Sequence, residues 1–312
     1  MRAPMLFTLA HLSDLHLPVP SGAIRPLGQL AGKRLLAYLA WRRKRRRAVP
    51  AGALLEDVAA AAPDHVAVTG DLTNLALPGE FAAARELLAA LGPPEGVTVV
   101  PGNHDATAAV PWVSGIGQWA PWMTGEAGEA PFPFLRRRGP VALIGLSSAV
   151  PTLPGSAAGR LGPAQLAALP ALLDAAGGME LFRIVLIHHP PLPGPGGRRK
   201  ALADGPALRG VLARHGAELV LHGHHHRPMQ GAIPGPVGPI PVLGPPQALA
   251  AGNGGPPGWQ ILRIGRDGDG WRVEVELRVQ DVANGPFRTA PPAVLRVSSA
   301  GGSSSSIPLA VR

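Results

Sequence analysis

The sequence predicts an α/β fold. Short apolar runs recur along the chain, and each of them ends at a Gly, Asp, Asn or His. Runs of this length that stop at turn-forming residues are typical of buried strands. Longer stretches rich in Ala, Leu and Glu lie between them and favour helix. The alternation of expected strands and helices is the pattern of an α/β domain.

Each expected element can be read in chain order. Strands are expected at 6–12, 65–69, 97–100, 141–146, 181–187 and 218–221. Helices are expected between them at 53–62, 79–91, 163–176 and 206–216. Three further strands, at 240–243, 259–264 and 271–279, are expected to add a second sheet layer. We therefore expect one domain over 1–283, with an insertion at 21–50. A tail rich in Pro, Ser and Gly, loosely attached, is expected over 284–312.

Composition limits the classes of protein that fit. Of the 312 residues 46% are hydrophobic, which is enough to bury a substantial core. The chain has no cysteine, which excludes a disulfide framework, thiolate metal sites and a cysteine nucleophile. No apolar stretch reaches the roughly 18 residues of a membrane span. No cleavage site follows the apolar start, so we expect a cytoplasmic protein. The formal net charge of +9 favours anionic partners.

The insertion interrupts the regular pattern with a basic segment. Residues 28–47 predict an amphipathic helix with a very basic end. The residues that indicate a helix with one apolar stripe and a basic end are Leu30, Arg34, Leu35, Tyr38, Leu39, Trp41 and Arg42. Two interpretations stay open. The helix packs on the domain and leaves its arginines in water, or residues 30–47 contact substrate or the anionic inner face of a membrane.

Polar side chains gather at the ends of the expected strands. They are Asp14, His16, Asp71, Asn103, His188, His224 and His226. The carboxyl ends of strands are where sites form in α/β sheets. A mixed set of oxygen and nitrogen donors suits Mn, Fe, Zn, Co or Ni. Seven donors are too many for one ion and suit two divalent ions if one carboxylate bridges them. Such a pair can clamp a phosphoryl group and activate water.

The order of these residues resembles the signature of the calcineurin-like metallophosphoesterase superfamily, in particular its cyclic-nucleotide phosphodiesterase-like branch. That signature is D-x-H, G-D, G-N-H-(D/E), H and G-H-x-H. The matching residues are Asp14-Leu15-His16, Gly70-Asp71, Gly102-Asn103-His104-Asp105, His188 and Gly223-His224-His225-His226. The resemblance implies a two-sheet β-sandwich flanked by helices, in an α/β/β/α arrangement.

The resemblance also implies a role for each residue. One divalent ion would be held by Asp14, His16 and His226, the other by Asn103, His188 and His224, and Asp71 would bridge them. His104 is implied as the general acid for the leaving oxygen, or as a phosphate donor. The family motif H-x-P selects His188 as ligand and leaves His189 beside the pocket. Asp105 is expected to orient its loop and His225 to line the pocket.

The implied activity is dimetal-dependent phosphoester hydrolysis. The chain is short for a regulated or nuclease-type member, which favours a phosphorylated small molecule, such as the diester of a cyclic nucleotide. One alternative is a membrane-associated lipid-nucleotide pyrophosphatase, which the basic segment suggests. A non-catalytic metal-binding or nucleic-acid-binding scaffold is the other, suggested by the charge of +9. The complete ligand set argues against a scaffold, so nucleic acid is the least favoured partner.

Three loops, at 21–50, 111–138 and 190–203, are expected to form the rim of the site. Five aromatic residues of the middle loop would supply an apolar wall or pack a lid, and packing is favoured for most of them. They are Trp112, Trp119, Trp122, Phe132 and Phe134.

Overall fold

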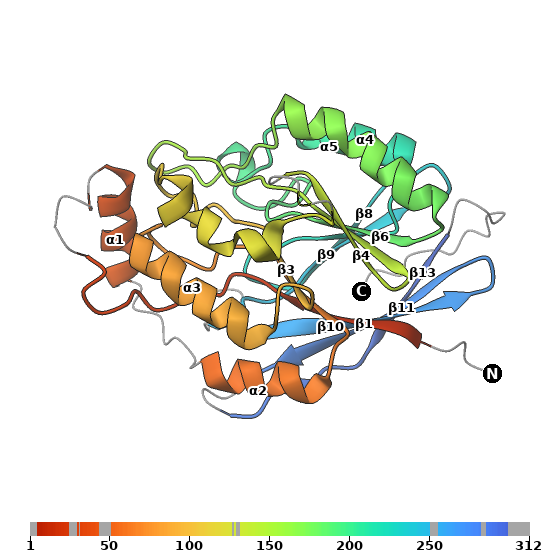
Figure 1. Ribbon diagram of the computed structural model, residues 1–312, viewed down its shortest axis with the longest axis horizontal. Coiled ribbons are helices and arrows are strands. Elements are labelled where there is room, and N and C mark those ends of the chain that lie inside the picture. The colour runs from red at the N-terminus through yellow and green to blue at the C-terminus, as the bar shows by residue number, and fades with distance from the viewer. Residues whose placement is uncertain are drawn as a thin grey trace.

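Two stacked β-sheets form the centre of the molecule, and helices cover the outer face of each (Figure 1). The computed structural model describes residues 5–24, 30, 32–43, 51–126, 128, 132–249, 255–281 and 285–298. The expected sandwich flanked by helices is confirmed. No helix among these residues is long and apolar enough to cross a membrane.

The first sheet has the strand order β12-β11-β10-β1-β2-β3, and β13 also pairs with β11. Its strands are β1 (Met5–Leu12), β2 (His65–Val68), β3 (Val97–Val99), β10 (Gly258–Asp267), β11 (Gly270–Val279), β12 (Arg288–Thr289) and β13 (Ala293–Val297). β1, β2 and β3 run parallel, and the C-terminal strands extend the sheet in antiparallel fashion.

The second sheet has the strand order β4-β5-β6-β7-β9-β8. Its strands are β4 (Phe134–Arg138), β5 (Val141–Gly145), β6 (Phe182–Leu186), β7 (Leu219–Leu221), β8 (Met229–Ile233) and β9 (Ile240–Gly244). The four central strands are parallel, and the edge strands β4 and β8 are antiparallel.

The helices form the two outer layers. α2 (Ala51–Ala61) and α3 (Pro78–Leu91) cover the first sheet, whereas α4 (Pro163–Gly178) and α5 (Gly205–His215) cover the second. In the described part of the chain, three short 3₁₀ helices lie in connecting loops: η2 (Trp112–Ser114), η3 (Ile116–Met123) and η4 (Gly197–Arg199).

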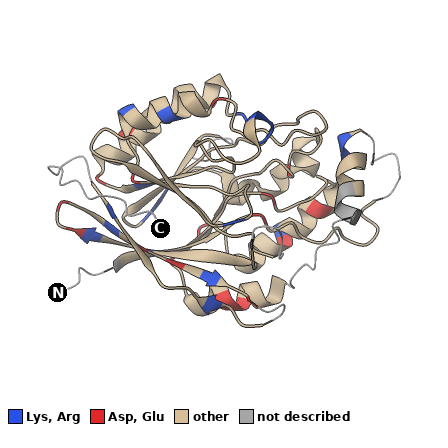
Figure 2. Cartoon of the chain, turned by 180° about the vertical axis from the view of Figure 1, so that it is seen from behind, with Lys and Arg blue, Asp and Glu red and all other residues tan. Residues whose placement is uncertain are grey.

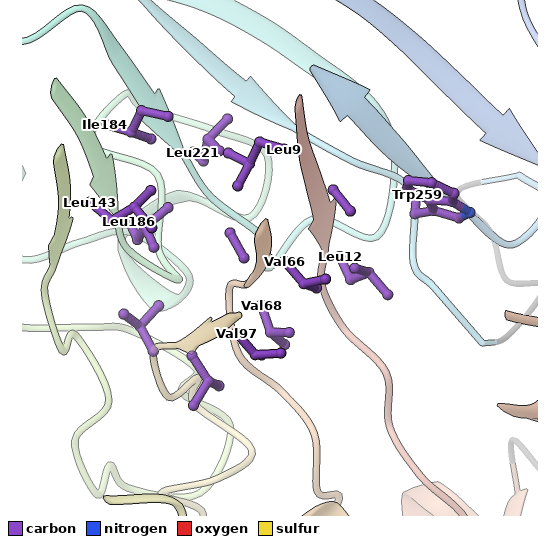
Figure 3. Close-up of a cluster of buried hydrophobic side chains, with 14 of the residues drawn as sticks. Leu9, Leu12, Val66, Val68, Val97, Leu143, Ile184, Leu186, Leu221 and Trp259 are labelled. Atoms are coloured by element: carbon purple, nitrogen blue, oxygen red, sulfur yellow. The ribbon is translucent and has the colours of Figure 1, made fainter. Parts of the chain in front are cut away.

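Side-chain alternation along the strands builds two apolar layers. In β6, Ile184 and Leu186 point into the space between the sheets, whereas Val185 packs with α4 and α5. Figure 3 shows Ile184, Leu186 and Leu221 of the second sheet facing Leu9 of the first. The parallel strands are buried on both faces, and this explains why they read as continuous apolar runs.

Part of the expected tail belongs to the first sheet. β13 pairs with β11 from Trp271↔Val297 to Val275↔Ala293, and Val297 is only 5% exposed. The expectation of a loosely attached tail is therefore wrong for 285–298, because these residues extend the sheet and bury Phe287 and Val297. Residues 299–312 of that tail lie outside the described residues.

The edge strand β4 was not expected because its sequence, Phe-Leu-Arg-Arg-Arg, is so basic. Arg136 is nevertheless buried, and its guanidinium donates hydrogen bonds to the carbonyl oxygens of Pro94, Val97, Pro121 and Thr124. A buried cation is tolerated when each of its nitrogens donates a hydrogen bond in this way. Arg136 thus ties β4 to two neighbouring loops.

The helix of the insertion, α1 (Lys33–Arg43), packs differently from the expected stripe. Ala37 and Tyr38 face the protein, next to a small cluster of Leu30, Leu75 and Leu77. Leu35 and Leu39 were expected on that face, but they are 42% and 44% exposed. The cause is Arg34, whose guanidinium donates to the carbonyl oxygens of Leu75 and Ala76 and turns the leucines outward. The basic residues 44–47 lie outside the described residues.

Candidate metal centre

The seven expected donors meet where parallel strands of both sheets end. Asp14 and His16 follow β1, Asp71 follows β2, and Asn103 follows β3. From the second sheet, His188 follows β6, and His224 and His226 follow β7. The sandwich therefore brings together side chains that are up to about two hundred residues apart in the chain.

One group of donors lies mainly on the first sheet. Asp14, His16, Asp71 and His226 each place one ligand atom so that all four lie within 4.8 Å of one another. The Nε2 atom of His226 is 3.2 Å from Asp14 Oδ1 and 3.2 Å from His16 Nε2. This is the set that sequence analysis assigned to one ion.

The second group is centred on Asn103. Its Oδ1 atom is 2.8 Å from Nδ1 of His224 and 3.2 Å from Nε2 of His188. Asp71 Oδ2 lies 3.4 Å from the same His188 nitrogen and 3.7 Å from His16 Nε2. Asp71 is thus positioned between the two groups, where a bridging carboxylate is expected.

The hydrogen bonds around the rings show that this site suits cations. Nδ1 of His188 lies 2.7 Å from the carbonyl oxygen of Thr69, and Nδ1 of His16 lies 3.3 Å from that of Thr73. A carbonyl only accepts, so each ring carries its proton on Nδ1 and turns the lone pair of Nε2 toward the site. Lone pairs of Nε2, amide oxygen and carboxylate then converge, an arrangement that a divalent cation satisfies.

Electrostatics keeps the two carboxylates ionised. Burial alone would raise the pKa of Asp14, but the nearby imidazoles, His226 foremost, lower it to about 2. His188 and His104 likewise lower the pKa of the buried Asp71 well below its usual range, against the effect of burial. Burial tends to lower the pKa of His188, but Asp71 raises it to about 9. A cation in this pocket therefore competes with a proton on His188.

The backbone at the site is strained. Eight non-glycine residues in the described part of the chain have a positive φ, and five of them are expected donors: Asp14, His16, Asp71, His224 and His226. Such left-handed conformations cost free energy and concentrate at functional sites, where surrounding contacts hold them in place. The strain shows that this geometry is imposed by the fold.

Three glycines allow the loops to approach each other closely. A Cβ atom on Gly70, whose φ is +91°, would come within 2.5 Å of the backbone nitrogen of Gly102. A Cβ on Gly223 would collide with Ser13 and lie 2.8 Å from Asp14 Oδ2. A side chain at any of these positions would push the loops apart, so glycine is needed there for the loops to touch.

Asp105 holds two of these loops together. Its carboxylate accepts hydrogen bonds from the backbone nitrogens of Asp71, Thr73 and Gly102, at 2.8–2.9 Å. Asp105 therefore orients the loops that carry Asp71 and Asn103, which is the role expected for it.

His104 lies beside the centre and belongs to neither donor group. Its backbone nitrogen donates to Asp71 Oδ1 at 2.7 Å, and its ring centroid is 4.7 Å from that of His16. Its Nδ1 atom lies 3.0 Å from the carbonyl oxygen of Asn74, which fixes the proton there. Nε2 is left as the ring atom that can exchange a proton.

The remaining histidines near the centre have protein partners. His189 lies close to His188 and His224, but Nδ1 of His189 is 2.8 Å from Ser148 Oγ and Nε2 is 3.0 Å from the carbonyl oxygen of Ala157. Both nitrogens are occupied, so His189 supports the pocket. His225 is half-buried beside Gly194.

The backbone carbonyls of Thr69, Thr73 and Asn74, which orient the rings of His188, His16 and His104, were not expected from the sequence. Only their position directly after β2 and Asp71 could have indicated them, because any residue type supplies a carbonyl.

The aromatic residues of the loop 111–138 were expected either to form an apolar wall or to pack, and two buried tryptophans agree with packing. Trp119 and Trp122 are buried, and their indole nitrogens donate to the carbonyl oxygens of Phe81 and Gly92, so they pack the core.

Comparisons with known proteins agree with this geometry. A family model described as calcineurin-like phosphoesterase matches residues 7–228. A curated protein of Enterobacter lignolyticus (strain SCF1), named glycerophosphodiester phosphodiesterase GpdQ, is 30% identical over 170 residues. That alignment covers 53% of this chain and 56% of the relative, so the chain matches little more than half of its length.

Solved structures share the fold. A dimetal phosphatase from Danio rerio superimposes with a TM-score of 0.56 at 13% identity, over 95% of this chain and 100% of that chain. GAP50, described as the anchor in the inner membrane complex of Plasmodium, gives a TM-score of 0.50 at 10% identity, over 95% and 90%. At these identities the likeness concerns the fold alone.

Proposed function

Because this chain belongs to the calcineurin-like phosphoesterase family, we propose that it is a dimetal-dependent phosphodiesterase for small diesters such as cyclic nucleotides. The observation that carries the proposal is the position of Asp71 Oδ2, 3.4 Å from His188 Nε2 of one donor group and 3.7 Å from His16 Nε2 of the other. The name of the relative, a glycerophosphodiester phosphodiesterase, supports a diester rather than a monoester.

The residues divide into two ligand sets. In this proposal Asp14, His16 and His226 hold one divalent ion, and Asn103, His188 and His224 hold the other, while Asp71 contacts both. Two such ions, of Mn, Fe, Zn, Co or Ni, would polarise the phosphoryl oxygens and supply an activated water. Five of the seven donors are buried, which strengthens electrostatic interactions with charge that develops during reaction.

The protein itself contributes a proton and a rigid geometry. His104 is held by the carbonyl of Asn74 at Nδ1, so its Nε2 atom can deliver a proton to the leaving oxygen. Asp105 and the strained loops keep Asp71 and Asn103 in position before substrate arrives. Such preorganisation avoids the cost of rearranging dipoles during the reaction.

The test is a comparison of diesters with a monoester. Manganese-loaded protein is assayed with bis(p-nitrophenyl) phosphate, cyclic nucleotides and p-nitrophenyl phosphate, with Asp71→Ala as control. We expect kcat/KM for the preferred diester to exceed that for the monoester by about tenfold or more, which is about 1.4 kcal/mol. A preference for the monoester, or equal turnover by Asp71→Ala, would refute the proposal.

Hydrolysis of a lipid nucleotide at a membrane is the second candidate. Three exposed leucines on α1, Leu35, Leu36 and Leu39, favour it, because a group of exposed apolar side chains is typical of a surface that contacts a membrane or a partner. The same assay with a lipid pyrophosphate distinguishes the two candidates.

A further inference from the structure

The outer face of α1 is apolar. Leu35, Leu36 and Leu39 are 42%, 54% and 44% exposed. At helical spacing these positions share one side, whereas Arg34, Ala37 and Tyr38 occupy the other and contact the protein. The inner face alone anchors the helix, so the leucines are not needed to hold α1 in place.

The apolar face continues into the neighbouring loop. Lys33, at the start of α1, donates a hydrogen bond from Nζ to Thr152 Oγ1. The next residue, Leu153, is 81% exposed. In Figure 1 the loop that follows β5 lies beside α1 at the same end of the molecule. The exposed Leu153 therefore lies next to the start of α1, the helix that carries the other three exposed leucines.

The same loop connects this region to η4. The backbone nitrogen of Ala157 donates to the carbonyl oxygen of Arg199 at 2.8 Å, and that of Gly159 to Ala201 at 3.1 Å. We call α1, residues 150–157 and residues 197–200 the docking rim. It lies beside the candidate metal centre, because Gly194, in the loop that leads to η4, packs against the ring of His225, next to His224: a Cβ atom on Gly194 would collide with His225 Nε2.

The docking rim carries positive charge only. Arg198, Arg199 and Lys200 are exposed, and Lys33 begins α1. No Asp or Glu occurs in residues 33–47, 147–162 or 190–203. Figure 2 shows Lys and Arg on α1 and on the small helix above the sheets at this end. The region is therefore complementary to an anionic surface.

We propose that the docking rim binds the surface of an anionic phospholipid membrane. Exposed leucines can enter the boundary between headgroups and acyl chains, and neighbouring Lys and Arg side chains are attracted to anionic lipid. A nucleic acid would use the cations but would gain nothing from aliphatic leucines, since it stacks on aromatic rings. A second copy of this chain would bring two positive surfaces together.

Binding of a membrane to the docking rim would also determine which substrates reach the candidate metal centre. A membrane against the docking rim presents the phosphate groups of its lipids to the mouth of the metal centre, so the substrate class would be a phosphoester or pyrophosphate of a lipid headgroup. This consequence rests on the second candidate function, hydrolysis of a lipid substrate at a membrane. The binding of the membrane does not.

Co-sedimentation with vesicles tests the binding. The full chain is mixed with vesicles of phosphatidylcholine, or of phosphatidylcholine containing about 30 mol% phosphatidylglycerol, at physiological salt. We expect the partition coefficient to be about tenfold or more higher on the anionic vesicles. Two triple variants, Leu35→Gln/Leu36→Gln/Leu39→Gln and Arg198→Ala/Arg199→Ala/Lys200→Ala, should each lower it by about tenfold or more.

Variants outside the docking rim control for the loss of exposed apolar side chains and for the loss of positive charge. Met179 and Val294 are 47% and 44% exposed but lie at the end of α4 and on β13. Met179→Gln/Val294→Gln should bind anionic vesicles like the wild type, and so should Arg85→Ala/Arg214→Ala. Circular dichroism melting shows whether each variant is folded, so that loss of binding by an unfolded chain is not counted.

Several results would overturn the docking rim. Equal binding to neutral and anionic vesicles would do so, and so would unchanged vesicle binding by the folded leucine variant. An oligonucleotide that releases the protein from vesicles, and that the leucine variant binds as well as the wild type does, would indicate a nucleic-acid surface instead. A dimer in sedimentation that the leucine variant abolishes would indicate a contact between two copies of the chain. Hydrolysis of bis(p-nitrophenyl) phosphate is scored separately. A chain that hydrolyses it but ignores anionic vesicles contradicts only the docking rim. A chain that binds vesicles but hydrolyses no phosphoester contradicts only the proposed function.

Discussion

His104 is the residue whose role can be separated most clearly from metal binding. Its backbone nitrogen contacts Asp71, whereas its ring is held by the carbonyl of Asn74 and takes no place in either donor group. A side chain in this position can act on the leaving group without changing the affinity for metal. Substitution of this one side chain can therefore separate a loss of turnover from a loss of metal.

Replacing His104 should reduce turnover and leave the metals in place. We expect His104→Gln to lower kcat by about 10²–10⁴-fold for a diester with a poor leaving group, such as a cyclic nucleotide. The loss should be much smaller for bis(p-nitrophenyl) phosphate, whose leaving group needs no proton. The measurements are kcat and metal content. An equal fall in kcat for both substrates would show that His104 is not the general acid.

Some features of single residues could be predicted from the sequence, and others could not. Asp14, Asp71 and His188 could be predicted as site residues because their polar side chains follow apolar strands. The groups that orient them are backbone carbonyls, such as that of Thr69, and these leave no trace in residue type. The left-handed φ of Asp14 and Asp71 could not be predicted either, since contacts with distant loops impose it.

At the scale of elements, apolar central strands were predictable, and edge strands were not. β4 is rich in arginine, and β13 follows a segment of Pro and Gly, so neither has the expected pattern. An edge strand needs only one apolar face, and in β13 Val297 is buried whereas Val294 is exposed. The basic helix α1 was expected, but the packing of Arg34 that turns its leucines outward was not.

The contribution of β13 can be measured with two valines of opposite orientation. Val297→Asp buries a carboxylate beside Trp271, so we expect the free energy of unfolding to fall by about 3 kcal/mol. Val294→Asp, on the exposed face, should change it by less than about 0.5 kcal/mol. Urea unfolding measures both. Similar values for the two variants would mean that β13 is not anchored in the sheet.

For the whole molecule, burial of histidine has a consequence for acid stability. Burial and the charges of Arg138 and Arg136 lower the pKa of His65 to about 3, and burial lowers that of His11 to about 3. In the unfolded chain each has a pKa near 6.5. The unfolded state therefore binds protons that the folded state does not, so stability is full above pH 6.5 and is lost as the pH falls toward 3.

This effect can be isolated with one variant. Each such histidine should contribute about 1.4 kcal/mol per pH unit to the slope of the unfolding free energy between pH 6 and 4. His65→Gln should reduce the slope by about that amount. Both proteins are unfolded in urea with a chelator present, so that metal release plays no part. An unchanged slope would show that His65 takes up its proton in the folded state.

The candidate metal centre is a property of the whole fold, because Asp14, Asp71 and Asn103 come from the first sheet and His188, His224 and His226 from the second. The most direct test is the ratio of metal to protein after loading with manganese and desalting, measured by plasma mass spectrometry. We predict two ions per chain for the wild type and less than one for Asp71→Ala, with His225→Ala as a control that keeps both. One ion or none in the wild type, or two in Asp71→Ala, would contradict the account.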